Sequence, residues 1–576
     1  MIPIESFLAR RNWIAQTLIA YSCDASFDSS ILAMLQKEED EEREITCALS
    51  QSSSQEYDID EMTFGRPDNR FQLGGLRRFQ RRDLARVLAM SHYANFSVPG
   101  AGKTAVALGC YEAERLRGRV ARLLVVAPLS AFDSWLTEAE RWMEPVPCVT
   151  WLDERIPEAC EILLTNYQRL AARLRDVSAW VMAKPCHVLL DEAHRIKRGR
   201  SGEWGSACLD LAYLAARRDI LTGTPAPQHP SDFVALFDFL WPQQATRILP
   251  SAALQANPPD DVMEEVSDRI APLFARTKKD ELGLVPPLIR VEYVDMGPLQ
   301  SMIYNAVRSR MVGQLNLTLQ VRAQLSRMAD VVMYLMEAAT DPALLAKSLN
   351  GAVPSTVWPP APVPDDSSLV DLIMRYHEYE MPSKFQKLAS IVDTNAAAGR
   401  KTLVWSNFVA NLEELAHRVL APHEPALIYG AIPSSPRETN FVTRQSELRR
   451  FRYDPNCWVL LANPAAMSEG VSLHHECHDA VYLDRTFNAG QYLQSIDRIH
   501  RLGLPIEAET RIISLVSVGT VDEIIDQRVR LKAERLSRML SDPNLTVMAL
   551  PEPDDYGQWV ETSDLDEMFV HLGIES

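Results

Sequence analysis

The stretch Ser97-Val98-Pro99-Gly100-Ala101-Gly102-Lys103-Thr104 has the composition of a loop that wraps its backbone around phosphate groups. Gly100 and Gly102 allow the backbone to approach an anion closely. Lys103 supplies an ammonium group for the phosphates, and the Thr104 hydroxyl is a ligand for magnesium. The sequence therefore predicts a nucleotide-binding loop in which Gly100, Ala101, Gly102, Lys103 and Thr104 contact the nucleotide.

A second motif, Asp191-Glu192-Ala193-His194, follows the apolar run at residues 188–190. An acidic pair after a strand is also a common helix start, since both charges suit the helix dipole. The phosphate loop upstream favours a catalytic role instead. We expect Asp191 to hold magnesium with Thr104, and Glu192 to orient and deprotonate the attacking water. Together, in this order and spacing, the two motifs predict an enzyme that is driven by a nucleoside triphosphate and uses magnesium.

Short apolar runs alternate with helical patterns in two stretches of the chain, which is typical of parallel α/β sheets. Residues 296–345 contain no such run and are predicted to be helical, and the proline-rich segment 354–366 is expected to be a surface loop or linker. Residues 521–540 form a charged amphipathic pattern that predicts a helix. The expected strands are residues 123–127, 162–165, 188–190, 220–222, 402–405, 458–461, 480–483 and 511–516.

The net charge of −18 is concentrated in two segments. Residues 24–68 hold 13 acidic and 3 basic residues, and residues 541–576 hold 9 acidic residues and no lysine or arginine. The rest of the chain is close to neutral and carries basic clusters at 195–200 and 276–279, which are candidate contacts for a polyanion. The acidic ends could occlude such a surface by imitating DNA, or could keep the protein in solution. Nine scattered cysteines without a Cys-x-x-Cys pair argue against a zinc ribbon and fit a reducing compartment.

The N-terminal segment, residues 1–70, is expected to be an accessory element. Residues 1–21 predict an amphipathic helix rather than a signal peptide, because polar residues interrupt the apolar run and no cleavage site follows. The acidic run 38–44 and the Ser/Gln-rich run 50–55 suggest a mobile link. The sequence has no apolar stretch of the length that spans a membrane.

Further motifs, taken in chain order, resemble those of the Swi/Snf-related branch of the superfamily-two DEAD/DEAH-type helicases, which are double-stranded DNA translocases. Gln80 stands where that family has its adenine-sensing glutamine, and residues 222–225 resemble its third motif. The helical bridge and the entry to the second lobe resemble the family at Gln300, 341–345 and 383–384. The other matching segments are residues 126–130, 276–280, 404–406, 468–473 and 494–503.

The resemblance implies an α/β fold with two RecA-like lobes, at residues 71–287 and 379–540. A helical bridge with a Pro-rich linker (288–378) would join them, after a helical N-terminal segment (1–70) and before an acidic tail (541–576). The resemblance also implies an ATP hydrolase with ATP and magnesium as cofactors. Lobe one would bind the phosphates, and lobe two would contribute Gly470 and the catalytic arginines Arg498 and Arg501. It also implies a sequence-independent track for double-stranded DNA, with candidate contacts at Ser130, Trp135, Thr165, Asn166, Ser406, Asn407, Ser468 and Gly470.

Three departures mark a divergent member of that group. Ala489 replaces a proline, Leu504 replaces a glutamine, and the phosphate loop opens with Ser97-Val98-Pro99-Gly100 in place of an acidic Asp-Glu-Met-Gly. None removes a catalytic side chain. The sequence suggests a compact motor of bacterial or phage type that serves a multi-protein system, in the cytoplasm at the nucleoid, or in the nucleus if the source is eukaryotic. A strand-separating DNA or RNA helicase and a nucleotide-gated DNA clamp remain alternatives.

Overall fold

The structure is a computed structural model in which the chain forms two compact units, residues Met1–Glu281 with Arg538–Asp542, and residues Leu282–Ser537 with Pro543–Ser576. The residues that it describes are 17, 20, 29–50, 58–59, 61–153, 155–226, 229–255, 258–259, 261–316, 324–348, 368–433, 442–464, 467, 473–485, 495–496, 498–500, 504 and 509–542. The amphipathic helix expected at residues 1–21 falls almost entirely outside these ranges.

The first unit is built around a seven-stranded parallel sheet with the order β3-β4-β2-β5-β6-β1-β7. Four of its strands are buried along their length, apart from the half-buried last residue of one of them, as expected when helices cover both faces of a parallel sheet. The strands are β1 (Tyr93–Asn95), β2 (Arg122–Val126), β3 (Val149–Trp151), β4 (Ile162–Thr165), β5 (Cys186–Asp191), β6 (Arg217–Leu221) and β7 (Phe274–Ala275).

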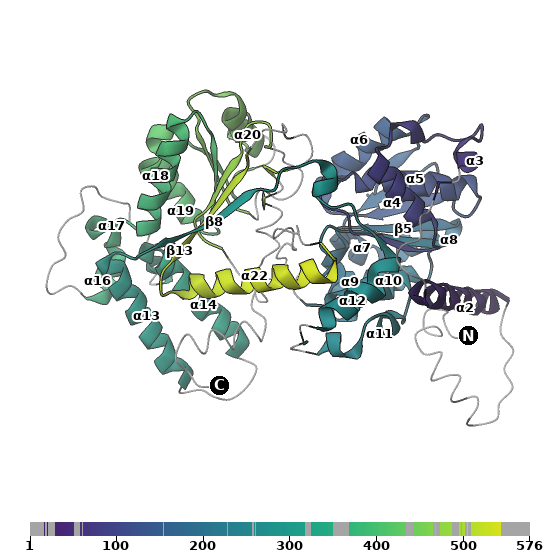
Figure 1. The fold of residues 1–576 in the computed structure, drawn as a ribbon, viewed down its shortest axis with the longest axis horizontal. Helices are drawn as coiled ribbons and strands as arrows, with labels where there is room; N and C mark the ends of the chain where they lie inside the picture. Colours follow the sequence, from purple (N-terminus) through teal and green to yellow (C-terminus); the bar gives the residue numbers. More distant parts are fainter. Residues whose placement is uncertain are drawn as a thin grey trace. The chain divides into compact units, whose positions relative to one another are not determined.

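Helices flank this sheet on both sides (Figure 1). The helix α5 follows the phosphate loop, and α4 packs beside α5. Other helices close the sheet on its opposite face. The helices of the first unit are α2 (Ser29–Ser50), α3 (Glu61–Phe64), α4 (Arg78–Leu88), α5 (Lys103–Leu116), α6 (Phe132–Trp142), α7 (Tyr167–Ala172), α8 (Leu174–Ala183), α9 (Glu203–Ala212), α10 (Asp232–Leu240), α11 (Ala245–Ile248) and α12 (Val262–Ile270).

The acidic run at residues 38–44 is helical rather than a mobile link, because it lies within α2. The carboxylate of Glu41 is almost completely buried, 2.5 Å from Arg218 and 2.8 Å from the Nε2 atom of His92. On the same helix, Lys37 donates to the carbonyl of Ala215. These partners lie far away in the sequence, so the local composition gave no sign that the run was anchored.

The second unit has a six-stranded parallel sheet with the order β10-β11-β9-β12-β13-β8. Its first strand in the chain, β8, covers residues that the sequence pattern placed at the start of the bridge, and it pairs with β13 over seven residues. The strands are β8 (Leu288–Val294), β9 (Thr402–Trp405), β10 (Ala426–Ile428), β11 (Val459–Ala462), β12 (Asp479–Tyr482) and β13 (Arg511–Ser517). The two parallel sheets confirm the expected α/β class.

The helices of the second unit include the helical region expected between the two alternating stretches. The charged amphipathic pattern near the end of the chain is confirmed as α22. The helices are α13 (Pro298–Asn316), α14 (Gln324–Thr340), α15 (Leu345–Ser348), α16 (Leu369–Met374), α17 (Tyr376–Tyr379), α18 (Ser383–Ala397), α19 (Val409–Glu414), α20 (Arg444–Tyr453) and α22 (Val521–Met539).

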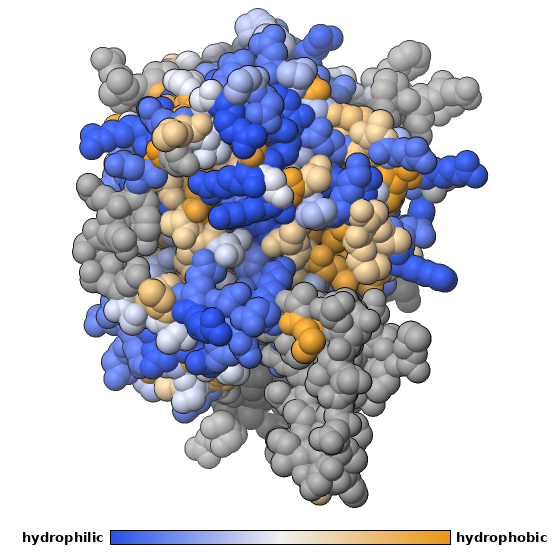
Figure 2. Space-filling view, turned by 90° about the vertical axis from the view of Figure 1, so that its right-hand side faces the viewer, coloured by the Kyte–Doolittle hydropathy of each residue, from blue (hydrophilic) through white to orange (hydrophobic). Residues whose placement is uncertain are grey.

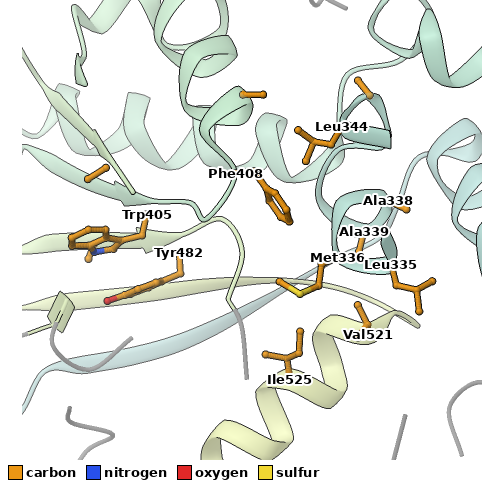
Figure 3. Packing of buried hydrophobic residues seen from close by; sticks show 14 of the residues in the cluster. Leu335, Met336, Ala338, Ala339, Leu344, Trp405, Phe408, Tyr482, Val521 and Ile525 are labelled. Carbon is orange, nitrogen blue, oxygen red and sulfur yellow. The ribbon is translucent and has the colours of Figure 1, made fainter. Parts of the chain in front are cut away.

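One hydrophobic core joins these helices to the sheet of the second unit (Figure 3). Met336 on α14 and Ile525 on α22 belong to the same buried cluster as Trp405 and Tyr482 from neighbouring strands. The rings of Trp405 and Tyr482 are stacked, with centroids 6.4 Å apart. Because the helical region and the sheet share this core, they form one packed body.

The surface of the molecule is mixed. Figure 2 shows a face on which hydrophilic residues predominate and apolar residues gather in separate patches between them. None of the helices in the described part of the chain combines the length and the apolar character that crossing a bilayer requires.

Candidate nucleotide-binding site

The phosphate loop connects β1 to α5 at the carboxyl end of the first sheet, the edge at which open α/β sheets bind ligands. Gly100 and Gly102 have φ angles of 83° and 80°, in the left-handed region that glycine adopts without strain. A Cβ atom on Gly102 would lie 2.2 Å from the Nε2 atom of Gln80. The loop therefore needs glycine at position 102 both for its backbone and for its close contact with Gln80.

Gln80, on the first turn of α4, is buried against the loop. Its Nε2 atom donates to the carbonyl of Ala101 over 3.2 Å, and its Oε1 atom accepts from the backbone N–H of Arg77 over 2.9 Å. The second bond caps the start of α4. The expected adenine-sensing glutamine thus lies in direct contact with the phosphate loop.

Lys103 and Thr104 are the first two residues of α5, and both are half-buried. The Nζ atom of Lys103 donates to the carbonyl of Ser97 over 3.0 Å, so the ammonium group lies over the opening of the loop. The N–H groups at the start of a fourteen-residue helix add partial positive charge at the same place. This combination suits a polyphosphate.

Asp191 is the last residue of β5, and both of its carboxylate oxygens accept hydrogen bonds. Oδ2 accepts from the indole N–H of Trp135 over 2.9 Å, and Oδ1 accepts from the N–H of Glu192 over 3.0 Å. The hydroxyl of Tyr167 donates to the Asp191 carbonyl over 2.7 Å. Glu192 has a φ of 51°, a left-handed conformation that costs a residue other than glycine about 1 kcal/mol or more. Strain of this kind is concentrated at functional sites.

His194 connects the acidic motif to residues 222–225. Its Nδ1 atom is 3.0 Å from the Thr222 hydroxyl oxygen, which also accepts from the N–H of Thr224. Burial lowers the pKa of His194 well below its usual value, and Arg195 lowers it further, so the imidazole is neutral. In the same segment, a Cβ atom on Gly223 would come within 3.0 Å of Pro99. The segment 222–225 is therefore packed directly against the phosphate loop.

The basic cluster at 276–279 is largely internal, so it is not the open anion-binding patch that its composition suggested. Arg276 and Lys279 are buried. The guanidinium of Arg276 lies 2.7 Å from Asp542 and donates to the carbonyls of Phe96 and Gly223. Asp542 belongs to the segment expected to be an acidic tail, yet it too is buried as the partner of this arginine. In the cluster at 195–200, Arg200 pairs with Asp210.

The second unit holds the remaining predicted site residues. Arg498 is half-buried, its N–H donates to the carbonyl of Ser495, and its carbonyl accepts from the N–H of Leu473 over 2.8 Å. Arg501 and Gly470 lie outside the described residues, as does Ser468.

Several side chains expected on a DNA track make contacts within the protein. Trp135 is only 1% exposed, and Thr165 is equally buried. Asn166 caps α7 by accepting from the N–H of Arg169. The hydroxyl of Ser406 is buried and donates to Asp484, which also accepts from the N–H and the side-chain amide of Asn407. The side chains of Trp135, Thr165 and Ser406 are therefore buried, which leaves the backbone groups at these positions as the candidates for a DNA contact.

Sequence reasoning missed two residues at this site. Tyr167 supports Asp191 from α7, and no local pattern marks it. Asp83 lies one helical turn after Gln80 and contacts Ser97 in the phosphate loop. Their spacing of three residues places both side chains on one face of a helix, and this signal could have identified Asp83.

Residues 51–344 match the SNF2-related domain, and residues 383–503 match the helicase conserved C-terminal domain. TATA-binding protein-associated factor 172 of Homo sapiens is 24% identical over 482 residues, which are 74% of this chain and 25% of that protein. Transcription regulatory protein SNF2 of Saccharomyces cerevisiae is 24% identical over 472 residues, 76% of this chain and 26% of that protein.

This chain spans between about a fifth and about a half of the length of the relatives that it matches. Among solved structures, the SWI2/SNF2 ATPase core of Sulfolobus solfataricus in complex with dsDNA is 19% identical, covers 83% of this chain and 95% of that one, and has a TM-score of 0.36. With the first domain match extending over half of its residues and the second following it in order, the chain belongs to the family of SNF2-related ATPases.

Proposed function

We propose that this protein is a DNA-dependent ATPase that couples ATP hydrolysis to movement along double-stranded DNA. The proposal is carried by the presence of both family domains together with the phosphate loop of the first. In that loop Gly100 and Gly102 have positive φ angles, and Lys103 is held over the opening of the loop by the carbonyl of Ser97. Strand separation is not required for such movement.

Within the first unit, the backbone amides of residues 100–104 and the ammonium of Lys103 bind the polyphosphate of ATP. Glu192 accepts a proton from the attacking water, which it orients toward the γ-phosphate. The hydroxyl of Thr104 and the carboxylate of Asp191 are hard oxygen donors of the type that Mg²⁺ prefers, so they fit a magnesium ion. Such an ion would neutralise charge on the phosphates.

Arg498 and Arg501 are proposed to stabilise the charge that spreads over the transferred phosphoryl group. An arginine in this role is worth about 10³-fold or more in rate. Both arginines belong to the second unit. Their response to ATP binding and release is the step that we propose to drive translocation.

Double-stranded DNA is proposed as the partner, bound through its backbone without regard to sequence and with a strong dependence on salt. A DNA substrate would bring the protein to the nucleoid of a bacterium or the nucleus of a eukaryote. Other subunits of a multi-protein system are proposed as further partners.

The first test is steady-state ATP hydrolysis with no nucleic acid, duplex DNA, single-stranded DNA or RNA. Glu192→Gln, which keeps the shape of the side chain but cannot accept the proton, serves as the inactive control. We expect strong stimulation by duplex DNA that disappears in the control. Stimulation by single strands or RNA instead would favour a strand-separating helicase.

Movement is tested by displacement of a third strand from triplex DNA, which reports translocation on a duplex. We expect ATP-dependent displacement without separation of the duplex strands. DNA binding that responds to ATP but gives no displacement and no turnover would indicate a nucleotide-gated clamp.

The two readings of the acidic tail are separated by removing residues 543–576, which leaves the buried Asp542 in place. Higher ATPase activity in the absence of DNA would support autoinhibition by the tail. Unchanged activity together with lower solubility would support the solubility role.

A further inference from the structure

Two side chains of the helix α4 contact the phosphate loop, one at each end of the loop. Gln80 holds the far end of the loop through the carbonyl of Ala101. One turn later, Asp83 reaches the opening of the loop, where its Oδ2 atom accepts from the hydroxyl of Ser97 over 2.8 Å. Both side chains are buried, and Asp83 is only 2% exposed.

Asp83, Ser97 and Thr277 form a closed triangle of hydrogen bonds. The hydroxyl of Thr277 donates to Asp83 Oδ2 over 2.7 Å, and the backbone N–H of Thr277 donates to the hydroxyl oxygen of Ser97 over 2.9 Å. Arg82 completes the arrangement by donating to the other carboxylate oxygen, Oδ1, over 2.9 Å and 3.1 Å. A buried carboxylate is costly unless it is paired and hydrogen-bonded, and here every partner is supplied.

Every polar group of Ser97 is engaged in a way that fixes the loop. Its hydroxyl is held by Asp83, its N–H donates to Asn95 Oδ1 over 3.0 Å, and its carbonyl accepts from the Nζ atom of Lys103 over 3.0 Å. The next N–H in the loop, that of Val98, donates to the carbonyl of Thr277. The position of Ser97 therefore determines where the carbonyl that holds Lys103 is placed.

We propose that Asp83 is a positioning residue for nucleotide binding, which acts through Ser97 on the phosphate loop and on Lys103. This deepens the proposed function and rests on it, since the loop must bind ATP. The contact between α4 and the loop is made by one carboxylate and one hydroxyl. Asp83 on α4 provides the carboxylate, and Ser97 in the loop provides the hydroxyl. The loop opens with Ser97, whose hydroxyl donates to Asp83, so the acid of this pair is supplied from the neighbouring helix.

The test is a reciprocal exchange in the full-length protein, with ATP affinity measured by titration of a fluorescent ATP analogue and KM and kcat measured by hydrolysis. Asp83→Ser and Ser97→Asp each destroy the pairing, the first by removing the acid and the second by placing two carboxylates together. Each single variant should weaken ATP binding by about 10- to 100-fold, the effect of losing a hydrogen bond to a charged group. The double variant Asp83→Ser/Ser97→Asp restores one carboxylate and one hydroxyl, and should bind within about threefold of the wild type.

The control variant Glu114→Ser shows whether the loss of any buried carboxylate in this unit has the same effect as the loss of Asp83. Glu114 is a buried, ion-paired carboxylate of the same unit, bonded to Arg117 and Arg119 at the far end of α5. We expect both Asp83→Ser and Glu114→Ser to lower the melting temperature, but only Asp83→Ser to raise the KM for ATP. The rise should be equal for ATP and GTP, because Asp83 acts on the phosphate loop. Gln80→Ala, in contrast, should reduce the preference for ATP over GTP.

Ser97→Ala gives a milder version of the test if Asp83→Ser does not fold, and it should raise the KM for ATP in the same direction. The inference is overturned if folded Asp83→Ser or Ser97→Ala protein binds ATP as the wild type does, or if the double variant is no better than the weaker single one. Failure of the wild-type protein itself to bind ATP, measured against Lys103→Ala, would overturn the proposed function instead.

Discussion

Trp135 donates its indole N–H to the carboxylate of Asp191 over 2.9 Å, from α6 to the end of β5. Residues that orient a metal ligand in this way typically change metal affinity or activity by about 10- to 100-fold when they are removed. A residue that resembles a DNA contact in the sequence is thus a support for the predicted magnesium ligand.

Replacing Trp135 by phenylalanine keeps an aromatic ring in the core but removes this hydrogen bond. We expect ATP hydrolysis to require about tenfold more Mg²⁺ for half-maximal rate. The matched control is Trp142→Phe on the same helix, where the indole donates to Glu138 and not to the site. An equal Mg²⁺ requirement in the two variants would contradict the role given to Trp135.

Gly102→Ala should abolish ATP binding. The added Cβ would meet Gln80 at 2.2 Å, in a backbone conformation with positive φ that alanine adopts at a cost of about 1 kcal/mol. Gly118→Ala is the control, because Gly118 follows the other end of α5 with a φ of 73° and has no neighbouring atom within 4 Å of the added Cβ. It should lower stability slightly and leave the affinity for ATP unchanged in an equilibrium titration.

Lys384→Met should destabilise the second unit by about 3–5 kcal/mol, the typical cost of removing one partner of a buried ion pair. Lys384 is fully buried, with its Nζ atom 2.5 Å from Asp522 and 3.0 Å from the carbonyl of Leu483. On the same helix, Lys387 pairs with Glu292 at the surface, so Lys387→Met should cost about 1 kcal/mol or less. Urea denaturation of the two variants measures this difference, and equal midpoints would refute it.

Acid should destabilise the first unit through His92. Burial lowers the pKa of His92 to about 3, and the charge of Arg218 adds to this effect while Glu41 opposes it. In the unfolded chain His92 takes up a proton near pH 6.5, whereas in the folded protein it does not. The contribution of neutral His92 to the free energy of unfolding is therefore complete above pH 6.5 and is lost as the pH falls from about 6.5 toward 3. The loss from this residue is about 1.4 kcal/mol per pH unit.

Melting temperatures measured between pH 8 and pH 5 test this expectation. His92→Gln cannot titrate, so its melting temperature should be lower than that of the wild type at pH 8 but should fall less steeply with acid. Parallel curves for the two proteins would show that His92 does not carry the proton linkage.

The sequence predicted the parts of the site that depend on local chemistry. Gly100, Gly102, Lys103 and Asp191 occur in short motifs whose residue types follow from phosphate and metal binding. In the structure the two glycines lie in the loop after β1, Lys103 begins α5, and Asp191 ends β5. The roles given to them in catalysis remain predictions. The eight strands expected from apolar runs are confirmed with shifts of a few residues.

What the sequence could not provide depends on contacts between distant residues. Nothing local shows that Glu41 is anchored by Arg218, or that Trp135 points at Asp191 rather than at solvent. The strand β8 escaped prediction because it lies at the edge of its sheet with a half-exposed pattern, which lacks the apolar run of a central strand.

The position of β8 has a consequence for synthesis of the protein on the ribosome. Among the residues that the structure describes, this edge strand pairs with β13 alone, whose residues follow it in the chain by roughly 220 positions. At about 5–20 residues per second, β8 leaves the ribosome roughly 10–40 s before its partner. During that time its backbone N–H and C=O groups form an open edge, which is a template for wrong pairing with other chains. The yield of native protein should therefore depend on how this one strand is protected while translation continues.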